Sequence, residues 1–379
     1  MRKIIKMTGI SIAVIFGLVV ILGTLFLNCS PQFGKGTTKE QKREYSKLGN
    51  FQNGKFTNQH PSPMDVNYWK LFKELTKKAP NRNPNTNLQI GKIDSTTIEN
   101  HDANITQLTW FGHSTFLLEI NGKKILIDPM LSKTPSPISF LGAKRYSNCI
   151  PIEAEKLPFI DAIILSHDHY DHLDYKTIKK LKNKVGRFYT PLGVGNHLKS
   201  WGVIEEKITE LNWWESVEFD SISLVCTPSR HFSGRGLFDR ATTLWCSWII
   251  KGTKDNIYFS GDSGYDSHFK EIGDKYGPFD ISLMECGQYN EDWKLLHMMP
   301  EETVRASLDL KSKLILPIHW GAFTLAFHDW TDPIERVLIK ANELNMPITT
   351  PKPGEPVMLG VEKFPSEKWW MNNINNNNN

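Results

Sequence analysis

Three histidines and one aspartate fall within six residues, at His167, His169, Asp171 and His172, directly after the apolar run DAIILS. Imidazole nitrogens suit zinc and iron, and a carboxylate oxygen completes such a ligand set. Residues two apart in a loop can point to one side, so we expect His167 and His169 to share one metal ion. Asp171 and His172 then face a second ion. The alternative is a polar, solvent-facing loop, but chance rarely produces these residues in this order.

Three further candidate ligands stand just after expected strands. His231 follows SISLVCT, Asp262 follows NIYFS, and His319 lies near the end of KLILPIHW. Loops at strand ends can converge while the sheet sets their spacing, so active sites concentrate there. Each residue also has an ordinary interpretation: a surface histidine, turn chemistry in Gly-Asp-Ser-Gly, or a core histidine. Alone, none of the three decides between these interpretations.

The elements that must position these residues lie between residues 105 and 365. FLLEI and KKILID flank Asn121-Gly122, which predicts two strands joined by a hairpin turn. Further strands are expected at KITEL, ESVEF, SISLVCT, TLWCSWII and NIYFSG. Strands and helices then alternate through DISLMEC, PEETVRASLDLKS, KLILPIHW and DPIERVLIKANELN. We therefore expect an α/β domain with helices outside its sheets, and the chain is long enough for two sheets.

His-x-His-x-Asp-His after a buried strand resembles the metallo-β-lactamase superfamily, over about residues 105–360. The resemblance implies an αββα sandwich, in which two mixed sheets pack face to face with helices outside. It also implies two divalent metal ions, most commonly zinc, at one edge of the sandwich. The ligands implied for the first ion are His167, His169 and His231. Those implied for the second are Asp171, His172 and His319, with Asp262 bridging both ions.

Flanking sequences narrow the resemblance to one branch of the superfamily. They are WFGHST, IDPM, SRHFSGRGLFDR followed by TLW, and HMMPEE. They are similar to the branch that contains N-acyl-phosphatidylethanolamine-hydrolysing phospholipase D, its bacterial relatives and sugar-phosphate lactonases. One departure is Ala241-Thr242, where the branch is expected to have an asparagine. The resemblance implies a phosphodiesterase acting on such phospholipids, and the alternative is a lactonase or another acyl hydrolase.

Several side chains near the expected ligands are candidates for catalysis. Asp171 can take a proton from the attacking water as well as bind metal. His297 precedes an expected helix start and can donate a hydrogen bond to a non-bridging oxygen or to the leaving group, or it is a capping or surface histidine. His113 can act in the same way or orient a metal ligand. The sequence does not decide a role for Glu285.

Two arginines beside His231 are candidates for substrate binding. The guanidinium of Arg235 can pair with two phosphate oxygens, and Arg230 adds a second positive charge. The alternative for Arg235 is an ordinary surface salt bridge. The expected substrate is a lipid or small-molecule phosphodiester.

Composition excludes other classes of protein. The chain has 45 Lys and Arg against 41 Asp and Glu, a net charge of +4, too weak to indicate a nucleic-acid partner. Its five cysteines include no Cys-x-x-Cys pair, which argues against a disulfide scaffold. The di-iron oxidoreductases of the superfamily usually have glutamate where His169 stands, and no flavin domain follows the expected metallo-domain. The sequence leaves the oligomeric state open.

The chain begins with a basic head followed by a charge-free apolar run from Met7 to Leu27. About 20 apolar residues suffice to cross a bilayer, so residues 1–27 are expected to be a membrane anchor or a signal segment. A cleaved signal peptide and lipid attachment at Cys29 remain alternatives. Short basic heads usually stay in the cytoplasm, which places the catalytic domain on the extracytoplasmic side.

The remaining boundaries follow from composition. Residues 28–104 are expected to be a polar tether and N-terminal extension, with one amphipathic helix over 65–78 that carries Trp69, Leu71, Phe72 and Leu75 on one side. Residues 105–365 form the expected metallo-hydrolase domain. Residues 366–379 are an Asn-rich segment, expected to be disordered.

Overall fold

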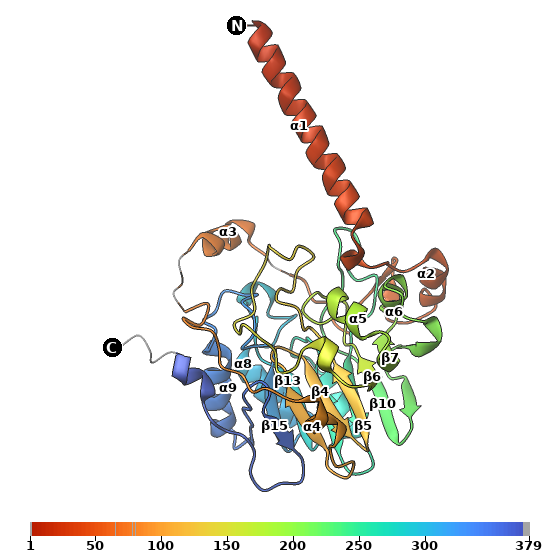
Figure 1. Ribbon diagram of the computed structural model, residues 1–379, viewed down its shortest axis with the longest axis vertical. Helices are drawn as coiled ribbons and strands as arrows, with labels where there is room; N and C mark the ends of the chain where they lie inside the picture. The colour runs from red at the N-terminus through yellow and green to blue at the C-terminus, as the bar shows by residue number, and fades with distance from the viewer. Residues whose placement is uncertain (1, 65, 78, 80, 374–379) are drawn as a thin grey trace.

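The computed structural model describes residues 2–64, 66–77, 79 and 81–373. Two mixed sheets pack face to face, and helices cover their outer faces (Figure 1). The αββα sandwich expected from the sequence is confirmed. Residues 374–379 of the expected disordered segment lie outside the described residues.

The first sheet has seven strands, in the order β15-β3-β4-β5-β6-β7-β8. Their bounds are β3 Gln107–Trp110, β4 Phe116–Ile120, β5 Lys123–Ile127, β6 Ile160–Ile164, β7 Val185–Pro191, β8 Ile208–Leu211 and β15 Pro356–Met358. Pairing is antiparallel from β15 to β5 and parallel from β5 to β8. The predicted hairpin joins β4 to β5, and Asn121 and Gly122 both have positive φ, as a type I′ turn requires.

The second sheet has six strands, in the order β14-β13-β12-β11-β10-β9. Their bounds are β9 Ser216–Phe219, β10 Ile222–Thr227, β11 Ser247–Lys251, β12 Asn256–Phe259, β13 Ile281–Glu285 and β14 Ile315–Ile318. Pairing is antiparallel from β9 to β12 and parallel from β12 to β14. A separate two-stranded sheet pairs β1 Phe51–Gln52 with β2 Lys55–Phe56.

Alternation along the strands divides the apolar residues between two layers. In β4, Phe116 and Leu118 face the core between the sheets, whereas Leu117 packs outward with Ile178 and Leu181. The latter two residues belong to α5, which covers the first sheet with α6. The outer face of the second sheet is covered by α7, α8 and α9. The helices of the domain are α5 Tyr175–Leu181, α6 Gly195–Ser200, α7 His268–Tyr276, α8 Pro300–Asp309 and α9 Asp332–Glu343.

Much of the segment expected to be a polar tether packs onto the domain. Tyr45, Phe51 and Phe56 are buried, with ring centroids 4.8–5.7 Å apart. The backbone N–H of Phe56 donates to the carbonyl of Ala241, next to the candidate site. The expectation of a tether is wrong for these residues because three aromatic side chains supply enough apolar area to anchor a polar segment. The helices here are α2 Lys39–Tyr45, α3 Tyr68–Thr76 and α4 Ser95–Glu99.

The segment after residue 365 also differs from expectation. Trp369 and Trp370 are buried, and Trp369 stacks on Trp320 with ring centroids 5.4 Å apart. Trp320 in turn lies beside Trp110, at 5.8 Å. The expectation of disorder is therefore wrong at least up to this pair, because the two indoles complete the core behind the candidate site.

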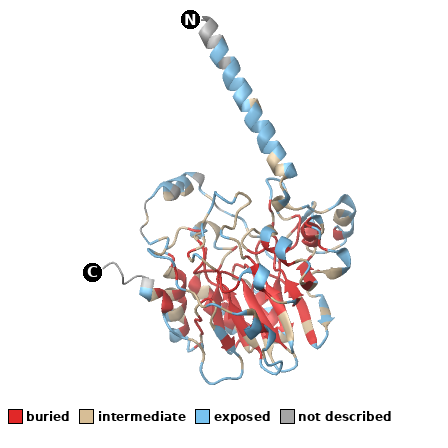
Figure 2. Ribbon diagram, in the orientation of Figure 1, coloured by how far each residue is buried: buried red, intermediate tan, exposed pale blue. Residues whose placement is uncertain are grey.

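The helix α1, Arg2–Cys29, projects from the domain (Figure 1). Among the described residues, α1 is the one helix that is both long enough and apolar enough to cross a membrane, over Ile10–Cys29. None of that stretch is buried against the protein, whereas most residues of the two large sheets are buried (Figure 2). Length and composition are the basis of this assignment.

Candidate metal centre

The candidate ligands gather at one edge of the sandwich because the strands that carry them run the same way. The end of β6, which is parallel to β5 and β7, leads directly into residues 167–172, here called the histidine motif. In the second sheet β10 and β12 are both antiparallel to β11, so the loops with His231 and Asp262 meet at one edge. β14 is parallel to β13, which adds His319. Both sheets therefore contribute to one site.

Three histidines form a first cluster with Asp262. His169 Nδ1 lies 2.9 Å from His167 Nε2 and 3.2 Å from His231 Nε2. Asp262 Oδ2 lies 3.7 Å from both His167 Nε2 and His231 Nε2. Burial lowers the pKa of His167, His169 and His231, so the neutral imidazole, which is the form that binds metal, is favoured.

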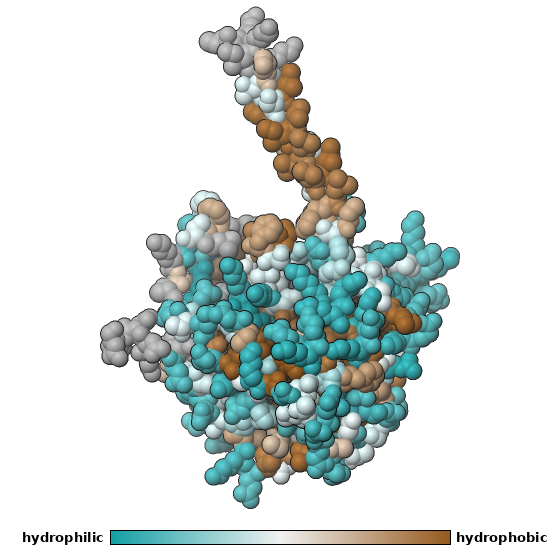
Figure 3. All heavy atoms as spheres, in the orientation of Figure 1, coloured by the Kyte–Doolittle hydropathy of each residue, from teal (hydrophilic) through white to brown (hydrophobic). Residues whose placement is uncertain are grey.

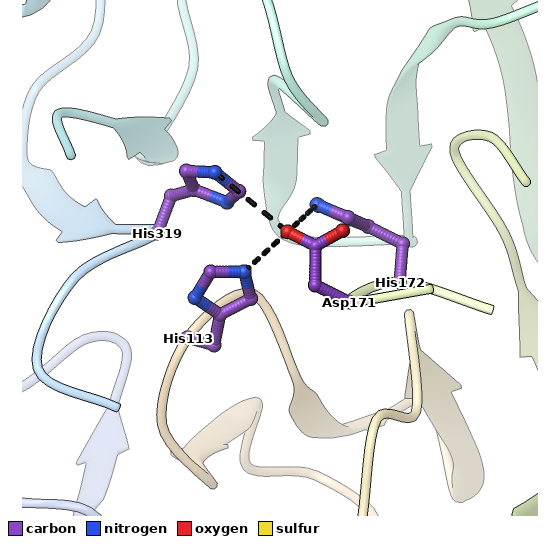
Figure 4. A group of neighbouring side chains, drawn as sticks. All are labelled: His113, Asp171, His172 and His319. Carbon is purple, nitrogen blue, oxygen red and sulfur yellow. Dashed lines mark hydrogen bonds and ion pairs between the residues drawn. The ribbon is translucent and has the colours of Figure 1, made fainter. Parts of the chain in front are cut away.

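A second cluster faces the other oxygen of Asp262. Asp262 Oδ1 lies 3.1 Å from His172 Nε2 and 3.1 Å from His319 Nδ1. Asp171 Oδ2 lies 3.6 Å from His172 Nε2, and His113 Nε2 lies 2.8 Å from the same oxygen (Figure 4). The structure thus brings together all seven residues expected to bind metal, and it adds His113.

The donor atoms of both clusters suit metal ions. His172 Nε2 and Asp262 Oδ1 are buried and have no hydrogen-bond partner in the described part of the chain. Buried polar atoms are almost always paired, because leaving one unpaired costs about 1–3 kcal/mol. The ligand atoms within each cluster all lie within 4.8 Å of one another. Imidazole nitrogens and carboxylate oxygens at this spacing can hold a divalent cation.

Hydrogen bonds on the far side of the rings set their orientation. His172 Nδ1 lies 2.6 Å from Asp128 Oδ2, and His231 Nδ1 lies 2.9 Å from the carbonyl of Leu296. His167 Nδ1 lies 2.9 Å from Ser166 Oγ. Each contact occupies one ring nitrogen and leaves the other to face the cluster, as in known metal sites.

His297 and Glu285 form a buried pair next to the second cluster. His297 Nδ1 lies 2.8 Å from Glu285 Oε2, and Glu285 Oε1 accepts the backbone N–H of Met298. Burial opposes the charged form of His297, but the charge and the hydrogen bond of Glu285 outweigh it and raise the pKa of His297. The ring of His297 stacks on that of His319, with centroids 5.3 Å apart. Glu285, for which the sequence decided no role, thus holds His297 at the site.

A cavity of about 240 Å³ opens onto both clusters. The residues of the clusters that reach it are His169, Asp171, His231, Asp262 and His319, together with His297. The rest of its wall is mostly apolar, formed by Met64, Phe232, Gln288, Trp293, Leu296 and Leu325. The polar groups of the clusters therefore converge in a pocket whose remaining wall is mostly apolar, an arrangement typical of ligand-binding sites.

The structure places Arg235 away from this cavity. Its side chain is buried, and it donates to the carbonyls of Asp168, Leu173 and Gln32 at 2.5–3.0 Å. The guanidinium also lies over the ring of Tyr170, 4.1 Å from its centroid. The expectation that Arg235 meets a substrate phosphate is corrected, because its donors are used to join the histidine motif to the segment after α1.

Arg230 is also engaged elsewhere. Its guanidinium donates to Ser62 Oγ and to the carbonyls of Pro61 and Tyr265, and it pairs with Asp266 at 3.5 Å. It does not line the cavity. The expectation of a substrate contact is corrected for Arg230 as well, because its donors hold residues 61–62 against the domain.

Two buried aspartates of the site were not singled out from the sequence. Asp128 accepts from Ser166 N at 2.7 Å and orients His172, while Asp168 accepts from Gly234 N and Thr243 Oγ1 at 2.7 Å. Asp128 lies in the sequence IDPM, which carried part of the resemblance, so its signal was present. Asp168 lies inside the histidine motif, between two candidate ligands, and its side chain points the opposite way.

Comparison with known proteins agrees with this geometry. The family described as beta-lactamase superfamily domain matches residues 123–320. An uncharacterized protein of Mycobacterium tuberculosis is 42% identical over 316 residues, covering 81% of this chain and 84% of that protein. N-acyl-phosphatidylethanolamine-hydrolyzing phospholipase D 1 of Caenorhabditis elegans is 34% identical over 290 residues, 73% of this chain and 81% of that protein.

Solved structures share the fold. The metallo hydrolase Igni18 of Ignicoccus hospitalis is 22% identical, with a TM-score of 0.51 over 68% of this chain and 100% of that chain. An isothiocyanate hydrolase from Delia radicum gut bacteria is 22% identical, with a TM-score of 0.52 over 66% of this chain and 98% of that chain. The chain belongs to the β-lactamase superfamily, and it is a metal-dependent hydrolase of the metallo-β-lactamase fold.

The first prediction concerns Arg235. Arg235→Ala should lower the free energy of unfolding by about 3 kcal/mol, because it leaves two buried carbonyls and one part-buried carbonyl without their donors. Urea-induced unfolding of the detergent-solubilised full chain measures this change. Arg187→Ala is the control, since Arg187 donates to the carbonyl of Glu206 at the exposed surface. An unchanged unfolding curve, combined with lost turnover, would return Arg235 to a role in substrate binding.

Proposed function

We propose that the protein is a phosphodiesterase of the phospholipase D type that hydrolyses N-acyl-phosphatidylethanolamine-like lipids. The observation that carries the proposal is the position of Asp262, which lines the cavity and whose two oxygens each face one ligand cluster. The similarity to the phospholipase D of Caenorhabditis elegans supports the choice of lipid. The reaction adds water across the phosphodiester and releases phosphatidic acid and an N-acylethanolamine.

We propose that two divalent ions, zinc foremost, occupy the two clusters. His167, His169 and His231 would hold one ion, Asp171, His172 and His319 would hold the other, and Asp262 would contact both. Divalent ions at these positions lower the pKa of water and offset negative charge on a phosphoryl oxygen.

The proposed catalytic roles follow from contacts at the cavity. Asp171 lines the cavity and takes the proton of the attacking water. His113 Nε2 donates to Asp171 at 2.8 Å and so keeps the carboxylate aimed at the cavity. His297 Nδ1 is held by Glu285, which leaves Nε2 to donate to a phosphoryl oxygen or to the leaving group. The apolar wall accommodates acyl chains.

Arg240 takes the role that the sequence had suggested for Arg235. Its guanidinium lies 3.7 Å from the centroid of the Phe232 ring and 3.1 Å from Met64 Sδ, and both of these residues line the cavity. In the described part of the chain no carboxylate forms an ion pair with it. An unpaired guanidinium at the rim of a metal centre suits the phosphate of an incoming headgroup.

One observation favours the alternative function, a lactonase or another acyl hydrolase. Among the described residues, no arginine or lysine lines the cavity itself. A neutral carbonyl substrate needs no cation there, and the same ligand clusters serve acyl transfer.

We also propose a separate role for each of several segments of the chain. Residues 105–365 hold the catalytic apparatus, and residues 1–27 form a membrane anchor that places the catalytic domain on the extracytoplasmic side. The exposed apolar surface of α1 supports the anchor. The packing of Tyr45, Phe51 and Phe56 makes residues 45–56 part of the folded body.

The second prediction concerns the metal content of the full chain. Protein saturated with zinc and then desalted should retain about two equivalents per chain, measured by mass spectrometry of the metal. Asp262→Ala should lower this to below one, because its carboxylate contacts both clusters. Asp266→Ala, on the same loop but paired with Arg230 and His60, is the control and should keep both ions. One equivalent in the intact protein would contradict a two-ion site.

The third prediction concerns the substrate. In mixed micelles, the zinc-loaded full chain should release phosphatidic acid and an N-acylethanolamine from N-acyl-phosphatidylethanolamine. Ordinary phosphatidylethanolamine and a panel of lactones run alongside as competing substrates. Efficient lactone hydrolysis without phosphatidic acid from either lipid would overturn the proposal and support the acyl hydrolase instead.

The fourth prediction separates the two functions through Arg240. Arg240→Gln should raise KM for the phosphodiester about tenfold, the loss of one charge-assisted hydrogen bond of about 1.4 kcal/mol. Hydrolysis of a neutral lactone should stay within twofold of the parent. Arg187→Gln, at a distant surface, is the control for charge. An equal effect of Arg240→Gln on both substrates would remove Arg240 from phosphate binding.

A further inference from the structure

Six large apolar side chains are exposed on three segments near the cavity, and we call them the apolar rim. They are Trp69, Phe72, Phe140, Leu141, Leu237 and Phe238. Phe238 is 93% exposed, and Trp69 and Phe72 are 66% and 55% exposed. The rings of Trp69 and Phe72, expected on one side of this helix, stack against each other in solvent, with centroids 5.8 Å apart. Such concentrations of exposed apolar surface usually mark an interaction site.

Contacts place all three segments of the rim around the metal centre. On α3, Lys70 Nζ donates to Asp292, next to the cavity-lining Trp293. Leu237 and Phe238 lie in the loop between Phe232 and Arg240, which contact each other at the cavity mouth.

The third segment, residues 132–141, lies over the histidine motif. A hollow next to the motif is lined by Ser132, Pro137 and Ser139 together with Tyr170 and Arg235. Phe140 and Leu141 follow this lining directly. The three segments of the rim therefore lie beside the cavity or the histidine motif rather than on a remote face of the domain.

The exit of α1 is clamped at the same place. The carbonyl of Pro31 accepts from Trp201 Nε1 at 2.6 Å, and that of Gln32 accepts from Arg235. Gln32 Nε2 donates to the carbonyl of Pro137, and Phe33 packs edge-on against Tyr170 of the histidine motif. No flexible linker therefore separates α1 from the metal centre.

Geometry then sets the distance between the domain and a bilayer. The 20 residues of Ile10–Cys29 span about 30 Å, the thickness of the hydrocarbon core. With this stretch in the membrane, the clamped residues 31–33 stand at headgroup level. Figure 1 shows α3 and the base of α1 at the same end of the domain, and Figure 3 shows apolar atoms on the surface beside that base.

Charge at the rim also fits a lipid surface. Lys73, Lys133, Lys144 and Arg240 lie on the three rim segments or directly beside them. Within the described residues none of these four forms an ion pair with a carboxylate. Exposed aromatic rings flanked by basic side chains are typical of protein segments that lie in the membrane interface.

We propose that the apolar rim enters the interfacial layer of the bilayer that α1 spans, so that the metal cavity opens directly onto the membrane surface. The occupant of the rim is the lipid bilayer, and the clamp at residues 31–33 holds the domain in this orientation. Substrate then reaches the cavity from the plane of the membrane. This inference rests on the placement of the rim and of α1, and it does not depend on which bond the enzyme hydrolyses.

The fifth prediction tests this orientation in the full chain reconstituted in vesicles. Phe238→Cys, in a background with Cys29→Ser and Cys149→Ser, is labelled with bimane. Brominated phospholipids should quench the label at least threefold more than they quench a label at Lys254→Cys. Aqueous iodide should show the reverse order. Lys254 is the control because it lies in the β11–β12 turn, at the opposite end of the strands from the metal centre.

Two outcomes would overturn the proposal. Equal iodide quenching at positions 238 and 254 would show that the rim faces water. Protection from iodide without bromolipid quenching, increasing with the protein-to-lipid ratio, would show that a second copy of the chain covers the rim. Leu237→Cys provides a second labelled position, and it should follow Phe238→Cys if the rim is in the bilayer. Because the readout is fluorescence, an inactive enzyme leaves the test valid.

Discussion

The carboxylate of Asp262 is the constraint on which the rest of the site depends. It is almost completely buried, and each of its oxygens faces imidazole nitrogens from a different cluster. A buried carboxylate is costly unless positive charge and hydrogen bonds compensate it. Three of the surrounding histidines have their outer nitrogens held by Asp128, Ser166 and the carbonyl of Leu296, and their other nitrogens face this carboxylate. The orientation of these three rings follows from both sets of contacts.

The site also exists only where the two sheets meet. The histidine motif comes from the first sheet, whereas His231, Asp262 and His319 come from the second. Each sheet alone would present an incomplete ligand set. The apolar core between the sheets therefore sets the distances between metal ligands, and a shift of about one ångström in the packing would be felt at the site. The packing that stabilises the sandwich therefore also assembles the metal centre.

The sequence predicted features that residues close together in the chain determine. It failed for side chains whose direction depends on the tertiary fold. The histidine motif and the hairpin at Asn121-Gly122 could be predicted because spacing and alternation determine them locally, and the αββα sandwich was implied by the resemblance that the motif carries. Arg235 was misread because its guanidinium is directed by carbonyls at residues 32, 168 and 173, which only the tertiary fold brings together. The buried Tyr45 and Trp370 were missed for a related reason. Average polarity of a segment hides the few aromatic residues that anchor it.

The pairing of β15 with β3 joins residues 356–358 to residues 107–109. The first sheet therefore remains open along one edge until the whole second sheet has been synthesised. α1 ends at Cys29, 78 positions before β3 begins at Gln107, and leaves the ribosome long before either sheet can close. Pairings so distant in the chain form slowly, because a large loop must be closed before any contact is gained. During translation the chain thus spends a long interval with its apolar helix already made and its catalytic body unfinished.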